Sequence, residues 1–94
     1  MLAIGDVMDH VMNEAIAADD KYGQPASTHE AMGVLLEEFH ELREAIQAND
    51  VEAVLRESVQ VSAVALRLAF VCQMACDATI RTPFARRSNL RCDV

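Results

Sequence analysis

The chain has 94 residues and a net charge of −7, and it is 52% hydrophobic but only 4% aromatic. This is the length of one small domain, and a composition rich in Ala, Val, Leu and Met favours an all-α fold. The charge is uneven along the chain. Residues 1–80 carry fourteen acidic and four basic side chains, whereas residues 81–94 carry one acidic and four basic side chains. An acidic body argues against binding to nucleic acid and suits a protein that holds divalent cations.

The cysteines and the most apolar segment indicate the compartment. Cys72, Cys76 and Cys92 are an odd number without a CxxC pair, which favours a reducing cytoplasm over a disulfide framework. Cys72 and Cys76 are interpreted as two buried thiols one helical turn apart. Residues 59–76 are strongly apolar but contain three long polar side chains, so they predict a buried helix and no membrane span.

Apolar residues at helical spacing over residues 2–19 predict a first helix that ends near Asp19–Tyr22. Tyr22-Gly23-Gln24-Pro25 then predicts a turn, because Gly is free in φ and Pro restricts the residue before it. Ser27 as N-cap and Glu30 three residues later predict a capping box. A second helix therefore begins here and runs to about Ala48.

Asn49-Asp50 ends the second helix and offers a new N-cap, so a third helix is predicted from Val51 to about Cys76. A connection this short makes helices two and three an antiparallel hairpin. The third helix is apolar on nearly every side, and we expect oligomerisation to complete the helical bundle. Residues 1–80 are thus the helical domain, and residues 81–94 are a tail or a short extra element.

Three glutamates fall at apolar positions of the expected hairpin. With about 100° of rotation per residue, Glu38 lies among apolar side chains of the second helix, Glu41 lies on the same seam, and Glu37 leans toward solvent. Glu57 lies in the middle of the apolar stripe of the third helix, with Gln60 at the edge of that stripe. A buried carboxylate without a partner costs several kcal/mol, so these groups require a counter-charge.

Two kinds of partner satisfy this requirement. One is an arginine, for which Arg43, Arg56 and Arg67 are the candidates, in a network of salt bridges between the helices. The other is a divalent cation, and ligand sets made of oxygen alone select hard ions such as Mg²⁺, or Mn²⁺. The spacing of the residues leaves both open.

The pattern Glu37-Glu38-x-x-Glu41, followed by Glu57-x-x-Gln60 on the next helix, resembles the EExxE…ExxD signature of the MazG-like all-α nucleoside triphosphate pyrophosphatases. Lys21-Tyr22-Gly23 and Ser27-x-His29-Glu30-Ala31 resemble the small MazG-like proteins of bacteria and mobile elements. The resemblance covers roughly residues 7–70.

The resemblance implies a homodimer or homotetramer that hydrolyses a (deoxy)nucleoside triphosphate to the monophosphate and pyrophosphate with Mg²⁺. By position, Glu38, Glu41, Glu57 and Gln60 would bind metal, and Glu37 and Glu38 would be the catalytic residues. The resemblance places Lys21 and His29 near the substrate, at the entrance to the second helix. Clearance of unwanted nucleotides is the role it suggests.

Gln60 departs from the family pattern, where an aspartate is expected. An amide carbonyl can bind Mg²⁺ but brings no charge, so a weaker second metal, a single-metal site and altered activity all stay open. A non-catalytic oligomeric module that binds nucleotide, metal or a partner protein is therefore the alternative. Glu37-x-x-His40 matches half of a di-iron motif, but the third helix lacks the other half, and we interpret His40 as a surface group.

Overall fold

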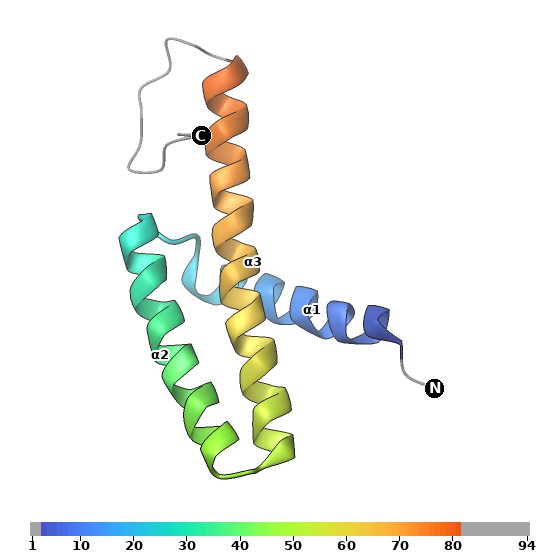
Figure 1. Cartoon of the computed structure of the whole chain (residues 1–94). Helices are drawn as coiled ribbons and strands as arrows, with labels where there is room; N and C mark the ends of the chain where they lie inside the picture. Colours follow the sequence, from blue (N-terminus) through green and yellow to red (C-terminus); the bar gives the residue numbers. More distant parts are fainter. Residues whose placement is uncertain (1–2, 82–94) are drawn as a thin grey trace.

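The computed structural model describes residues 3–81, and the side chains of residues 3–78. It contains three helices: α1 (Ile4–Tyr22), α2 (Thr28–Gln47) and α3 (Val51–Arg81) (Figure 1). The described residues contain no strand. The predicted all-α fold is confirmed.

Helix α1 is followed by Gly23, whose backbone conformation only glycine adopts readily. The Gly23 backbone has φ 74° and ψ −175°, and its N–H donates to the Asp19 carbonyl. This region of backbone space is nearly closed to residues with a Cβ atom, so Gly23 terminates the helix. At the other end, Asp6 Oδ2 accepts from the Ala3 N–H at 2.9 Å. The helix therefore begins two residues later than predicted, and it ends at Tyr22, within the predicted range of Asp19–Tyr22.

Helix α2 begins where the sequence predicted, with a variation in its cap. Ser27 Oγ accepts from the Glu30 N–H at 3.1 Å, as an N-cap should. Glu30 Oε1 accepts from the Ala26 N–H at 3.4 Å, one residue earlier than a standard capping box requires. The N-cap prediction is thus confirmed, and the reciprocal contact is shifted by one residue.

The connection between α2 and α3 is three residues long. Asn49 has φ 56°, a conformation that asparagine tolerates, and Asp50 Oδ1 accepts from the Ala53 N–H at 3.1 Å. Figure 1 shows α2 lying beside the first half of α3 and running in the opposite direction, with α3 continuing past α2. Helix α3 extends to Arg81, beyond the predicted end near Cys76. The predicted tail lies outside the described residues except for Arg81.

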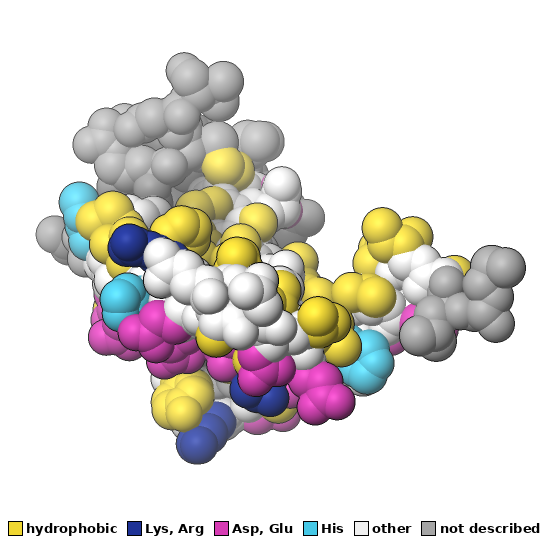
Figure 2. All heavy atoms as spheres, turned by 60° about the horizontal axis from the view of Figure 1, so that its bottom comes forward, with side chains coloured by type: hydrophobic (Ala, Val, Ile, Leu, Met, Phe, Trp, Pro, Cys, Tyr) yellow, Lys and Arg dark blue, Asp and Glu magenta, His cyan; other side chains and the backbone are white. Residues whose placement is uncertain are grey.

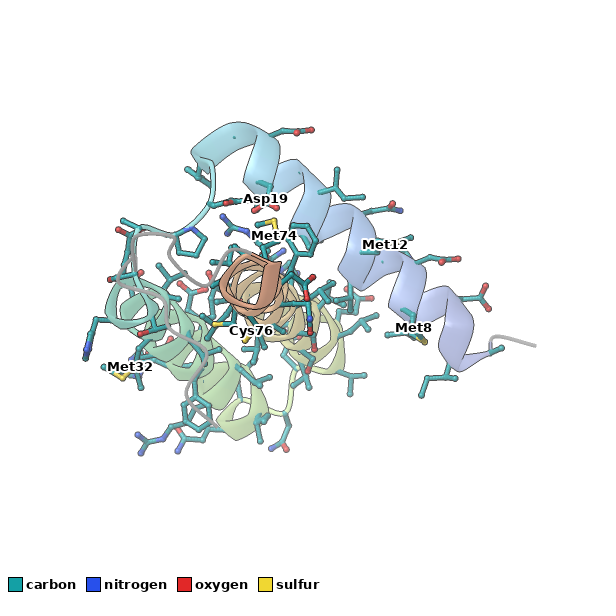
Figure 3. The ribbon with its side chains drawn as sticks, turned by 90° about the horizontal axis from the view of Figure 1, so that it is seen from above. Met8, Met12, Asp19, Met32, Met74 and Cys76 are labelled. Atoms are coloured by element: carbon teal, nitrogen blue, oxygen red, sulfur yellow. The ribbon has the colours of Figure 1, made fainter. Side chains whose placement is uncertain are left out.

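Helix α1 crosses α3 and does not pack against α2 in the described part of the chain (Figure 1). Arg67 joins the two helices: its Nε donates to Asp19 Oδ1 at 2.7 Å, and its Nη2 donates to the Gly23 carbonyl at 2.7 Å. Figure 3 shows Asp19 on the part of α1 beside α3, whereas Met8 and Met12 lie on the part that extends away. The C-terminal end of α1 is therefore fixed, and its N-terminal half projects.

The core of a single chain is small. The buried hydrophobic residues are Ala15, Ala31, Ala45, Ala63 and Val71. Among the residues whose side chains are described, fifteen large apolar ones are exposed by 39% or more. Figure 2 shows hydrophobic side chains, in yellow, on the projecting part of α1 and over the body. Only 22% of an 18-residue apolar window of α3 is buried, so a single chain does not bury this helix as predicted.

An 18-residue window within Val51–Ala78 has a mean hydropathy of 1.6, and this helix is long and apolar enough to cross a membrane, by length and composition only. Cys72 is a half-buried free thiol, whereas Cys76 is disulfide-bonded. The interpretation of both cysteines as thiols is therefore wrong for Cys76.

Candidate metal centre and adjoining cavity

Three glutamates from two helices converge at the α2–α3 seam. One carboxylate oxygen each from Glu38, Glu41 and Glu57 lies within 4.8 Å of the other two. The helical period directs Glu38 and Glu41 to the same side of α2, and the short connection brings that side against Glu57 of α3. The structure thus brings together three of the four residues predicted to bind metal.

Little positive charge balances this cluster. Arg56 Nε lies 3.6 Å from Glu57 Oε1, but the Arg56 side chain is 65% exposed while that of Glu57 is 17% exposed. Arg67 is directed to Asp19, and Arg43 forms no ion pair with any residue in the described part of the chain. An exposed ion pair contributes at most about 1 kcal/mol, so arginine does not neutralise the three carboxylates.

The carboxyl groups of α2 show this imbalance in their pKa values. Burial, followed by the charges of Glu41, Glu57 and Glu37, raises the pKa of Glu38 above its ordinary value. The pKa of Glu41 is also raised, first by a hydrogen bond with the Glu57 carboxyl group and then by the charge of that group. Glu41 itself is exposed. The cluster therefore favours either a bound proton or a bound cation.

The donor set fits a hard divalent cation. It consists of carboxylate oxygens alone, with no sulfur or imidazole ligand among the clustered residues. Two oxygens bound on opposite sides of Mg²⁺ lie about 4.2 Å apart, since each Mg–O distance is about 2.1 Å. One oxygen from each glutamate lies within 4.8 Å of the others, so a small inward movement would reach that geometry. Glu38, Glu41 and Glu57 would hold the ion, at the open edge of the seam.

Gln60, the fourth predicted metal ligand, makes a different contact. Its Nε2 donates to Glu14 Oε2 of α1 at 3.0 Å. The side chain thus joins α3 to α1 one helical turn beyond Glu57. An aspartate at this position could not donate such a hydrogen bond.

A cavity of about 410 Å³ opens beside the carboxylates, where the three helices meet. Such a volume accommodates a small organic molecule. Glu37 and Glu38 line it from α2, and Gln60 lines it from α3. The remaining lining residues are Glu14, Ala18, Tyr22, Gly23, Pro25, Glu30, Ala31, Val34, Ala63, Val64 and Arg67. Glu38 thus belongs to both the carboxylate cluster and the cavity wall.

Lys21 and His29, the two residues predicted near the substrate, are exposed and are not among the residues that line the cavity. The Lys21 ammonium group lies 5.1 Å from the centre of the Tyr22 ring. His40 is 65% exposed and lies 3.0 Å from Glu44, which agrees with its interpretation as a surface group.

Glu14 is a cavity residue that the sequence did not single out. Its signal was nevertheless present, because Glu14 follows Val7 by seven residues and Val11 by three, on the apolar stripe of α1. A carboxylate on such a stripe is the same anomaly that identified Glu57.

No protein-family model, curated protein or solved structure matches the chain.

Proposed function

We propose that the protein is a Mg²⁺-dependent pyrophosphohydrolase that converts a (deoxy)nucleoside triphosphate to the monophosphate and pyrophosphate. The convergence of Glu38, Glu41 and Glu57 beside a cavity of about 410 Å³ carries the proposal. A nucleotide has two parts that match this arrangement: a polyanion that needs a cation, and an organic moiety that needs a cavity.

The glutamates at this site have two different roles in the proposed reaction. Glu38, Glu41 and Glu57 hold the metal, which when bound neutralises phosphate charge and lowers the pKa of water. Glu37 lines the cavity next to Glu38 and is exposed, so its carboxylate can position a water molecule and accept its proton. The apolar lining excludes water from the organic part of the substrate. Mn²⁺ meets the same ligand requirements as Mg²⁺.

The proposed enzyme is a homodimer or homotetramer. In the described part of the chain, five hydrophobic residues are buried and fifteen large ones are exposed, so the protein gains most by burying that surface against another copy. The N-terminal half of α1, with Ile4 82% and Met8 64% exposed, is a natural contact surface. The solution mass at micromolar concentration is then a multiple of the 10.3 kDa protomer, and a monomeric mass refutes this part of the proposal.

The test is release of pyrophosphate from a panel of ribo- and deoxyribonucleoside triphosphates with Mg²⁺ or Mn²⁺. The Glu57→Gln variant should lose metal-dependent release, because one of three charged ligands is removed. Glu44→Gln is the matched control, since Glu44 is 66% exposed and lies on α2 one turn from Glu41. Unchanged release in Glu57→Gln refutes the assigned metal site.

The second candidate function is a non-catalytic module that binds nucleotide or a partner protein. The Gln60–Glu14 hydrogen bond favours this second function, because Gln60 stands where the family that the sequence resembles has a carboxylate for catalysis. This reading predicts binding of Mg²⁺ and nucleotide with no pyrophosphate released from any member of the panel.

A further inference from the structure

The cavity wall presents hydrogen-bond acceptors and little free positive charge. Four of its residues are glutamates: Glu14, Glu30, Glu37 and Glu38. Arg67 is the single cation among the described residues that line it, and two of its nitrogens donate to the Asp19 carboxylate and the Gly23 carbonyl at 2.7 Å each. The wall therefore repels an anion and attracts a group that donates hydrogen bonds.

Glu14 is the glutamate on the side of the cavity formed by α1. Its Oε2 atom accepts from Gln60 Nε2 at 3.0 Å, which restrains the carboxylate between α1 and α3. Both residues also line a second hollow of about 230 Å³. The pair is thus shared by the two hollows, and Gln60 acts here as a positioning residue.

The same cavity has small apolar side chains on α2 and α3. Ala31 and Ala63 are buried, and Val64 lines the cavity beside them. Short side chains leave room for a flat ring and remove it from water. A planar heterocycle with an amino group at its edge matches an apolar surface of this kind facing a fixed carboxylate.

We infer that this cavity holds the base of the nucleotide and that Glu14 determines specificity by accepting a hydrogen bond from an exocyclic amino group. This inference rests on the proposed function. Cytosine, adenine and guanine carry such a group, and carboxylates are known acceptors for the amino group of cytosine. Uracil in place of cytosine, and hypoxanthine in place of adenine, carry a carbonyl oxygen at the matching position, which would face the Glu14 carboxylate without a proton between them. Hypoxanthine in place of guanine carries only a C–H at the position of the amino group.

The activity test compares matched pairs of substrates with the full chain. CTP against UTP, ATP against ITP and GTP against ITP each isolate one amino group. We expect kcat/KM to favour the amino member of at least one pair by about tenfold, because the other member cannot donate this hydrogen bond to the charged and solvent-exposed Glu14 carboxylate. Glu14→Gln should remove most of that preference, since an amide offers both a donor and an acceptor.

Two further variants separate recognition from folding. Asp9→Asn, an exposed change on the same helix, should keep the wild-type preference. Gln60→Ala should lower the preference mainly through KM for the amino-bearing substrate, while kcat for the other member of the pair is retained. Wild-type preference in both Glu14→Gln and Gln60→Ala would overturn the inference.

A binding measurement distinguishes failure of the inference from failure of the proposed function. Cytidine and uridine, which carry no phosphate charge, are titrated by calorimetry into the metal-free protein, with adenosine, guanosine and inosine as further probes. Tighter binding of an amino-bearing nucleoside, weakened in Glu14→Gln, supports the inference even if no triphosphate is hydrolysed. Hydrolysis with equal kcat/KM within every pair overturns the inference and leaves the proposed function standing. Absence of both hydrolysis and binding overturns both.

Discussion

We expect Glu57→Gln to be more stable than the wild-type protein without metal and less stable than it with Mg²⁺. In the metal-free state, the substitution removes repulsion from Glu38, whose carboxylate lies within 4.8 Å. That repulsion is about 1 kcal/mol after screening by the solvent around Glu38. The substitution also removes a charge from a side chain that is only 17% exposed, and it loses the 3.6 Å contact with the exposed Arg56.

The net effect expected in EDTA is a gain of about 1 kcal/mol in the free energy of unfolding, or about 4–8 °C in Tm for a domain of this size. With Mg²⁺ at a hundred times its Kd, the wild-type protein gains about 2.7 kcal/mol. A variant that binds about a hundredfold more weakly gains only about 0.4 kcal/mol under the same conditions. The wild type then becomes the more stable protein.

Urea unfolding followed by circular dichroism measures both states, at one fixed protomer concentration because oligomers make stability depend on concentration. Glu44→Gln, the exposed control, should change the free energy of unfolding by less than about 0.5 kcal/mol with or without Mg²⁺. The reasoning is refuted if Glu57→Gln is less stable than wild type in EDTA, or if Mg²⁺ stabilises both proteins equally.

Three further predictions concern the same helices. Because the folded-state pKa values of Glu38 and Glu41 are raised above 4.5, the folded protein retains protons that the unfolded chain releases; the resulting stability is full below the unfolded pKa and is lost as pH rises through the folded pKa. Metal-free Glu38→Gln should therefore gain in Tm relative to wild type as pH rises from 4 toward neutrality, and a constant difference would contradict this assignment. Arg67→Met removes two hydrogen bonds of a side chain that is 14% exposed, and should lower the free energy of unfolding by about 2 kcal/mol in a urea titration, against no more than a small change for Arg43→Met. Gly23→Ala introduces a Cβ atom at φ 74° and should cost about 1–2 kcal/mol by the same titration, whereas Gly33→Ala on exposed α2 should be neutral or stabilising.

The order of the helices and their ends on either side of the Asn49-Asp50 break could be predicted because local chemistry decides them. Ser27 and Asp50 satisfy the free N–H groups of the helices they begin, and Gly23 takes a backbone conformation closed to other residues. The convergence of the glutamates was also within reach of the sequence. A fixed helical period and a three-residue connection leave few ways to place Glu38 and Glu41 other than against the helix that carries Glu57.

The position of α1 was decided by the tertiary structure alone. Five residues, 23–27, separate α1 from α2, and no local rule in such a segment fixes the angle at which α1 crosses α3. That crossing brings Glu14 to Gln60 and Asp19 to Arg67, across 46 and 48 residues of sequence. The sequence by itself thus determined the carboxylate cluster, because period and connectivity are local properties. The cavity beside it depends on contacts between distant residues, and only the packed chain could decide those.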